Sequence, residues 1–272
     1  MRASRLVLSG GLLVMALACS KAEPPQVEAA GPRTVHVTAT DFAFQAPDTL
    51  HSGLTSFHLM NSGKEMHHLI ILKLAEGQSV ADLARPGPPP ANLVMSGGPN
   101  VAPPEGTAEA VVDLQPGRYA LLCVIPSADG MPHVAKGMSK EVIVIPGETA
   151  PAAPTPDITI SLSDYDFTLS KPLAAGRHVV KIENTAAQPH ELVLVKLEPG
   201  KTVQQAVEWL EKMQGPPPGT PLGMGVSPLS SGQVNYVTMD LTPGEYGFIC
   251  FLPAPDGRIH VAHGMIKQVS VQ

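Results

Sequence analysis

Cys123-Val-Ile-Pro-Ser-Ala-Asp-Gly-Met-Pro-His133-Val-Ala-Lys-Gly-Met138 is one of two stretches in this chain that share a single design. The other is Cys250-Phe-Leu-Pro-Ala-Pro-Asp-Gly-Arg-Ile-His260-Val-Ala-His263-Gly-Met265. Both place nine residues between the Cys and the first His, and four between that His and the Met. A thiol, an imidazole and a thioether together form a ligand set that suits copper. The repeated spacing therefore predicts two copies of one metal-binding unit.

The repeat extends upstream of these two stretches. Asp164-Tyr-Asp-Phe167 matches Asp41-Phe-Ala-Phe44, and Asn184 to His190 matches Asn61 to His67, each 123 positions further on. Between the two cysteines the offset grows to 127 positions. The strand-like parts thus keep their lengths, and the middle segment of the second copy absorbs the extra residues, as loops commonly do.

Length and composition favour two β-domains. The chain has 272 residues, with 29 Pro, 25 Gly and few aromatic side chains, which is typical of short strands separated by many turns. We therefore predict an all-β protein of two tandem Greek-key β-sandwiches, with domains at 34–146 and 158–272 joined by a Pro/Ala linker at 147–157. A capping box at Thr202-Val-Gln-Gln205 also predicts a short helix inserted in the second domain.

The amino terminus indicates export. Residues 1–19 combine Arg2 and Arg5 with a short apolar run and small residues before Cys19. This end resembles a bacterial lipoprotein signal, which implies a lipidated Cys19 and a membrane tether, although Ala16 stands where that motif usually has Leu. Plain cleavage after Ala18 is the alternative. Residues 20–33 are polar and proline-rich, so we expect a flexible tether and a periplasmic or cell-surface location.

The remaining cysteines are Cys123 and Cys250, one in each copy. A disulfide between them is one option for an exported protein. However, equivalent positions in two separate cores would not meet, and a metal bond to each thiol is the other reason for two unpaired cysteines to persist.

Each domain resembles a plastocyanin-type blue-copper domain of the cupredoxin family. Asn184 followed by Pro189-His190 fits the family's first ligand, as does Asn61 with His67, and the two Cys…His…Met stretches resemble its ligand loop. The resemblance implies a type 1 copper site in each domain, with three equatorial ligands and an axial Met. The implied ligands are His67, Cys123, His133 and Met138 in the first domain, and His190, Cys250, His260 and Met265 in the second.

One spacing departs from that family, because its Cys-to-His gap is much shorter than nine residues. The extra segment carries the turn Asp129-Gly130 or Asp256-Gly257. It either bulges outward and returns the His to the metal or leaves the His out of reach.

The other histidines have weaker claims. His68 and His263 are not histidine in the other copy, so we expect them to face solvent, with His263 as an alternative to His260 as ligand. Four more lie in strand or turn patterns and receive no role: His36, His51, His58 and His178.

The function follows from the predicted sites. A net charge of −6 does not indicate a nucleic-acid partner. Copper nitrite reductases and multicopper oxidases join two copper centres through a His beside the Cys, but neither Cys here has one, and the sequence has no His-x-His pair. We therefore expect a non-enzymatic blue-copper protein that passes electrons between redox partner proteins. Copper delivery or storage, and a metal-free interaction module, are the alternatives.

Overall fold

The computed structural model describes residues 31–84, 93–147, 152–212 and 215–272. The predicted export signal, Cys19 and nearly all of the predicted tether lie outside these residues, as does part of the predicted linker. Within the described residues, no helix is long and apolar enough to cross a membrane.

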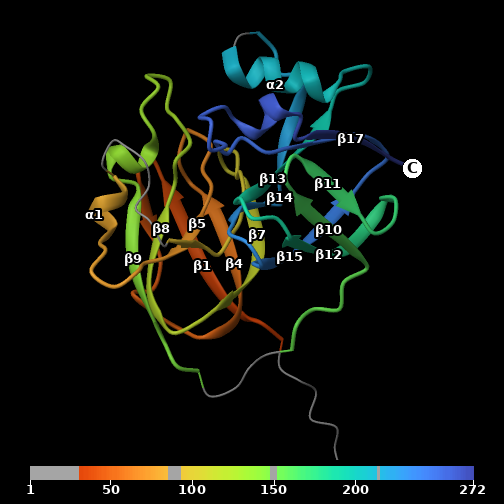
Figure 1. The fold of residues 1–272 in the computed structure, drawn as a ribbon. Helices are drawn as coiled ribbons and strands as arrows, with labels where there is room; N and C mark the ends of the chain where they lie inside the picture. Colours follow the sequence, from red (N-terminus) through yellow and green to blue (C-terminus); the bar gives the residue numbers. More distant parts are fainter. Residues whose placement is uncertain (1–30, 85–92, 148–151, 213–214) are drawn as a thin grey trace, which may run out of the picture.

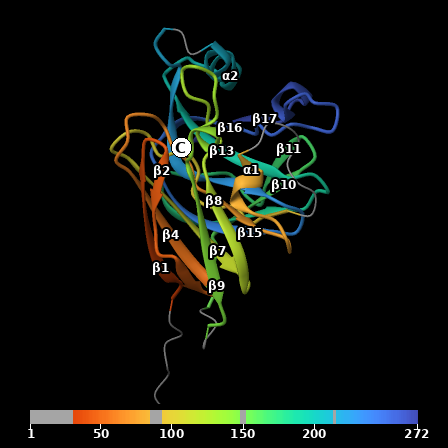
Figure 2. The same ribbon diagram turned by 90° about the vertical axis from the view of Figure 1, so that its left-hand side faces the viewer.

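The first half of the chain folds into strands that form two facing layers, seen from the side in Figure 2. One layer has the order β7-β4-β1-β2 and the other β3-β9-β8-β5-β6. The strands are β1 (Arg33–Thr40), β2 (Ala43–Gln45), β3 (Thr49–His51), β4 (Gly53–Asn61), β5 (Ile70–Lys73), β6 (Val94–Met95), β7 (Thr107–Leu114), β8 (Gly117–Leu122) and β9 (Ser139–Ile145).

The second half repeats this plan, with layers β11-β10-β12-β15 and β14-β13-β16-β17. In both halves the first strand pairs in parallel with the strand that leads to the predicted Asn, as β1 does with β4 and β10 with β12. The strands are β10 (Ile158–Ser163), β11 (Asp166–Leu169), β12 (Gly176–Asn184), β13 (His190–Leu197), β14 (Gly219–Leu229), β15 (Val234–Leu241), β16 (Gly244–Ile249) and β17 (Ile266–Val271).

The two halves share one sheet, which the sequence did not predict. β7 pairs antiparallel with β15, so one layer of each half joins a single sheet of eight strands that crosses the molecule (Figure 1). Pairing with β15 covers the free edge of β7, and an uncovered edge strand is a template for aggregation. The fusion thereby sets how the two predicted sites lie relative to each other.

Each half buries its own apolar core between its layers. In the first half this core includes Phe57, Leu59, Leu121 and Cys123, and in the second half it includes Phe167, Phe248 and Cys250. The inward residues alternate along β10, as expected for a strand with one face on a core. Each Cys directly follows its core strand, β8 or β16, and this position fixes the thiol at one end of the sandwich.

The predicted helix is present in the second half. α2 (Val203–Lys212) begins at Thr202, whose hydroxyl accepts from Gln205 N while the Gln205 amide oxygen accepts from Thr202 N. Its apolar side, with Val203, packs over β13 and β16, whereas the α-helix described in the first half is the four-residue α1 (Val80–Leu83).

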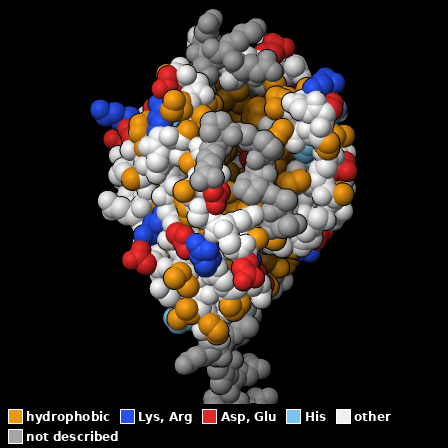
Figure 3. Space-filling model, turned by 60° about the vertical axis from the view of Figure 1, so that its left-hand side comes forward, with side chains coloured by type: hydrophobic (Ala, Val, Ile, Leu, Met, Phe, Trp, Pro, Cys, Tyr) orange, Lys and Arg blue, Asp and Glu red, His pale blue; other side chains and the backbone are white. Residues whose placement is uncertain are grey.

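Charged side chains do not gather by sign on the face drawn in Figure 3. Acidic and basic groups are scattered among neutral and apolar ones over the described part of this face. This distribution agrees with the modest net charge of −6.

Candidate metal centres

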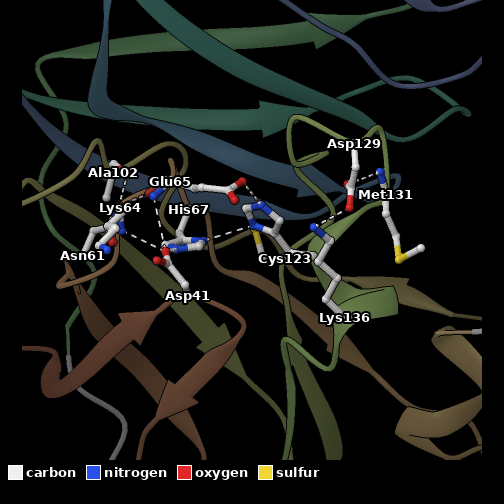
Figure 4. A network of polar contacts seen from close by, with 11 residues as sticks. Asp41, Asn61, Lys64, Glu65, His67, Ala102, Cys123, Asp129, Met131 and Lys136 are labelled. Atoms are coloured by element: carbon white, nitrogen blue, oxygen red, sulfur yellow. Dashed lines mark hydrogen bonds and ion pairs between the residues drawn. The ribbon is translucent and has the colours of Figure 1, made fainter.

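Three predicted ligands of the first half meet at one end of its sandwich, and we call His67, Cys123 and His133 the first centre (Figure 4). His67 Nδ1 lies 3.1 Å from His133 Nδ1, which lies 3.4 Å from Cys123 Sγ. All three side chains are fully buried. The second centre, His190, Cys250 and His260, repeats this geometry, with distances of 3.0 Å between the Nδ1 atoms and 3.4 Å from His260 Nδ1 to the thiol sulfur.

A buried Asn explains the spacing of the first ligand. Asn61, the last residue of β4, donates from its side chain to the carbonyls of Glu65 and Ala102 at 2.8 and 2.9 Å. Its side-chain oxygen accepts from Gly63 N. These bonds fold the chain back on itself and set His67 beside residue 102, with which it exchanges two main-chain bonds. Asn184 makes the equivalent bonds before His190.

The long Cys-to-His segment is a small outward hairpin. Pro126 pairs with Pro132, the turn closes at Gly130, and His133 N donates to Ile125 O at 3.0 Å. His133 then starts a 3-10 turn that ends at Gly137. The segment therefore bulges and returns the His to the thiol, and the second copy does the same around Gly257.

Carboxylates fix the tautomers of the first centre. His67 Nε2 lies 3.3 Å from Asp41, and His133 Nε2 lies 2.9 Å from Glu65. A carboxylate accepts only, so each Nε2 carries the proton and each Nδ1 presents a lone pair. Two lone pairs and a sulfur then face one another without water, an arrangement that a cation relieves. The donor set thus fits a bound metal ion on its geometry alone, and mixed soft and borderline donors favour copper.

Burial also sets the protonation states of the donors. It lowers the pKa of His67 and of His190, so both imidazoles stay neutral. It raises the pKa of the Cys123 and Cys250 thiols to about 12. A thiolate at these positions therefore requires a positive partner, and a coordinated metal deprotonates a thiol outright.

The second centre differs at one contact. Asp164 holds His190 Nε2 at 2.9 Å, as Asp41 holds His67. However, Gln188 stands where the first half has Glu65, and the buried His260 Nε2 has no hydrogen-bond partner within the described residues. The Gln188 side-chain oxygen is likewise unpaired there. Burial lowers the pKa of His260 to about 4.

The predicted axial residues lie next to the centres. Met138 and Met265 are fully buried and join the same cores as Cys123 and Cys250. The main-chain N–H of each Met donates to the carbonyl of its ligand His at 3.0 Å. Each Met is thus bonded through its main chain to a ligand His and lies in the same core as the ligand Cys. Its role as axial ligand stays a prediction.

An aromatic side chain covers each centre, a feature that the sequence analysis missed. The rings of Phe42 and Tyr165 lie edge-on to those of His133 and His260, with 5.3 Å between ring centroids in each pair. Phe42 and Tyr165 also have φ angles of 70° and 68°, which are unusual for residues other than Gly. Strained backbone of this kind concentrates at functional sites.

The sequence analysis also missed the contacts of two aspartates, Asp41 and Asp164, with the ligand imidazoles. Their match between the two copies was visible in the sequence, but only the fold places them on the ligand imidazoles.

Two further histidines test the remaining expectations. The expectation that His68 faces solvent is wrong: it is buried, and its Nε2 accepts from Val124 N at 3.0 Å. Its counterpart Glu191 is also buried and accepts from Phe251 N at 3.1 Å. His263 is half-buried and stacks on Tyr165 at 4.7 Å, so it is His260 that joins the second centre.

Comparisons with known proteins agree with this fold. No family model and no curated protein matches the chain. Among solved structures, auracyanin A, a "blue" copper protein from Chloroflexus aurantiacus, is 20% identical, with a TM-score of 0.32 over 42% of this chain and 100% of that chain. A blue copper oxidase from Nitrosomonas europaea is 15% identical over 89% of this chain and 86% of its own, with a TM-score of 0.27.

A third match corrects one expectation. The copper-containing nitrite reductase of Thermus scotoductus is 13% identical over 88% of this chain and 61% of its own, with a TM-score of 0.25. The expectation that the protein is not an enzyme is therefore contradicted, because oxidases and a reductase are among the proteins similar to both halves together.

Each half consists of two stacked layers of strands. A Cys lies at the end of a core strand in each half, and the chain after it brings a His back beside the Cys. Both halves have the cupredoxin fold, and their His, Cys and His side chains fit tandem type 1 copper sites.

Proposed function

We propose that the protein is an exported copper protein that transfers electrons between redox partners, with one type 1 copper site in each half. The observation that carries this proposal is the pair of buried His/Cys/His groups, in which imidazole lone pairs converge on a thiol away from water. Bound copper supplies a one-electron couple at each group.

The side chains of the chain hold and tune that couple. In the first half His67, Cys123 and His133 are the proposed equatorial ligands and Met138 the axial one. In the second half the equivalent set is His190, Cys250, His260 and Met265. The sandwich holds these donors in place before copper arrives, so little rearrangement accompanies a change of oxidation state. Asp41 and Asp164 orient one imidazole in each set by accepting a hydrogen bond from its Nε2–H.

The partners and the location belong to the same proposal. The amino-terminal signal supports export, and lipidation of Cys19 would tether the protein at a membrane surface. We propose that the partners are redox proteins on that side of the membrane and that no nucleic acid takes part.

Copper loading of the purified chain tests the proposal. We expect an intense visible thiolate-to-copper band and a reversible redox couple. Cys123→Ser and Cys250→Ser should each remove part of the band, and the double variant should remove all of it. A colourless protein without bound copper would overturn the proposal in favour of a metal-free module, and exchangeable copper without a reversible couple would favour delivery or storage.

A further inference from the structure

The segment 96–102 of the first half is clamped to the second half. Ser96 and Pro99 form bridges to Leu229 and Val226 of β14. Gly97 N donates to Pro228 O at 3.0 Å, and Ser227 N donates to Gly98 O at 2.9 Å. This segment is therefore a fixed part of the contact between the two halves.

One end of this segment is bonded to the first centre. Ala102 N donates to His67 O at 2.7 Å, and His67 N donates to Ala102 O at 3.1 Å. Ala102 has no exposed surface, so no water competes for these bonds. The main chain of a ligand residue is thus tied directly to the segment.

Two residues before Ala102, the same segment contacts the residue next to a ligand of the second centre. Asn100 is buried, and its side-chain nitrogen donates to Val226 O at 2.9 Å and to the Glu191 carboxylate at 3.4 Å. The other oxygen of Glu191 accepts from Phe251 N at 3.1 Å. Glu191 directly follows His190 and Phe251 directly follows Cys250, so this carboxylate touches the chain beside two ligands.

Residues that adjoin both centres in the sequence line a common cavity of about 400 Å³. Its lining includes Met66 and Val124, which adjoin ligands of the first centre, and Glu191 and Phe251, which adjoin ligands of the second. Asn100, Val101 and Glu191 also line this cavity, so the contact between Asn100 and Glu191 lies at its wall.

We propose that the two centres exchange an electron within one molecule through the contact of Asn100 with Glu191. The inference rests on the proposed function, because both centres must hold copper. In the step, copper in one centre passes from Cu(I) to Cu(II) while copper in the other passes from Cu(II) to Cu(I), and no bond or proton changes. Covalent and hydrogen bonds couple such centres better than empty space, and Asn100–Glu191 is the longest link of the route.

Rapid partial reduction of the copper-loaded protein tests this inference. A small radical reductant in a short pulse creates an uneven distribution of electrons, and absorbance with freeze-quenched paramagnetic resonance follows its relaxation. The single-centre variants Cys123→Ser and Cys250→Ser supply the reference signals. We expect a first-order phase whose rate does not depend on protein concentration, and which slows severalfold in Asn100→Ala.

Asn235→Ala is the matched control. Asn235 is also buried and also bonds the same segment across the junction, because its side chain accepts from Gly98 N at 2.9 Å and donates to Ser96 O at 2.9 Å. It is not on the proposed route, so its variant should leave the first-order rate unchanged. Thermal unfolding and the copper spectrum report whether each variant keeps its fold and its centres.

A second variant covers a failure of Asn100→Ala to fold. Glu191→Gln keeps the shape of the side chain but replaces one of the two carboxylate oxygens by an NH2 group, so it cannot accept from Phe251 N at one position and from Asn100 at the other, and the same slowing is expected. Three results would overturn the inference: no first-order phase, a rate proportional to protein concentration, or equal effects of Asn100→Ala and Asn235→Ala. A chain that binds no copper would instead overturn the proposed function.

Discussion

The two centres have the same donors and different hydrogen-bond partners. In the first centre both imidazoles donate to carboxylates, Asp41 and Glu65. In the second centre Asp164 holds His190, and His260 Nε2 has no partner among the described residues. An unpaired buried donor costs about 1–3 kcal/mol.

This difference separates the residues that place the donors from the residue that polarises one imidazole. The shared Asn, Asp and hairpin place the donors, whereas the residue at 65 or 188 sets how strongly one imidazole is polarised. Only the first centre has both imidazole tautomers fixed by carboxylates. We therefore infer that its imidazoles are better oriented for metal binding than those of the second centre.

Removing the buried Asn should have the largest effect and should be equal in the two halves. Asn61→Ala and Asn184→Ala each lose three hydrogen bonds, which corresponds to about 3 kcal/mol of unfolding free energy at about 1 kcal/mol per bond. Urea unfolding of the apo protein measures this loss, with the exposed Ser62→Ala as control. Markedly unequal losses would show that the two halves do not share one frame.

Exchanging the residues at 65 and 188 should move the two reduction potentials in opposite directions. A carboxylate on the ligand imidazole raises its donor strength and stabilises Cu(II). Glu65→Gln should therefore raise the potential of the first centre, and Gln188→Glu should lower that of the second. We expect shifts on the order of 60 mV, the one-electron equivalent of a tenfold change in equilibrium constant.

Redox titration in single-centre backgrounds measures each of these potentials. Glu141→Gln is the control, because Glu141 is paired with Arg118 in the same half. Shifts of the same sign in both centres, or none, would refute this account of their difference.

The hairpin tips should tolerate change with a smaller cost. Gly130 and Gly257 hold φ angles of +78° and +83°, and a Cβ there would meet nothing within 4 Å. Gly→Ala should cost about 1–2 kcal/mol from the backbone alone, and Gly→Asn less. Thermal midpoints measure this cost. Because His133 is held by Ile125 O rather than by the tip, the copper band should stay unchanged, and its loss would mean that the tip positions the ligand.

The smallest difference in stability between the halves is expected from a surface ion pair. Lys267 lies 2.8 Å from Asp166, and this hydrogen bond lowers the pKa of the carboxyl below its usual value of 3.8. The lowered pKa means that the stabilisation is present above about pH 4 and is lost as the pH falls through the folded-state pKa. The pair is partly exposed, so Asp166→Asn should cost about 0.5 kcal/mol or less at pH 7.

Unfolding measured from pH 7 down to pH 2 checks the direction of this effect. The wild type and Asp166→Asn should converge in acid, and a gap that widens there would contradict the assignment. The equivalent Lys140 pairs with Asp48, whose side chain is 88% exposed, so Asp48→Asn should change less.

Repetition made the ligands predictable from the sequence. Cys, His and Met keep their spacing in both copies, which separated His133 and His260 from the other histidines. The same logic failed where the copies differ. Glu65 has no acidic counterpart at Gln188, and His68 was predicted to face solvent although it and its counterpart Glu191 are both buried.

The shared sheet could not be predicted for another reason. A strand that pairs with the other half keeps the same inward and outward alternation as one at a free edge. The sequence pattern of β7 and β15 therefore did not indicate that these two strands pair with each other. Asp41 and Asp164 were visible as a repeated feature, but their contact with an imidazole 26 residues away depends on the folded sandwich.

The junction of β7 with β15 has one further consequence. Its register places Val112 opposite Asn235 and Val111 opposite Tyr236. Extended by one residue, this register would bring together Ala110 and Val237, which hold the same position in the two copies. The bridge between Pro99 and Val226 also joins equivalent positions. Pairing of equivalent residues is what a twofold axis produces in an isologous dimer.

The chain is thus the covalent counterpart of a symmetric dimer. In a dimer of identical subunits any substitution alters both sites at once. Joined in tandem, the copies are free to diverge, so one molecule carries Glu65 at one centre and Gln188 at the other.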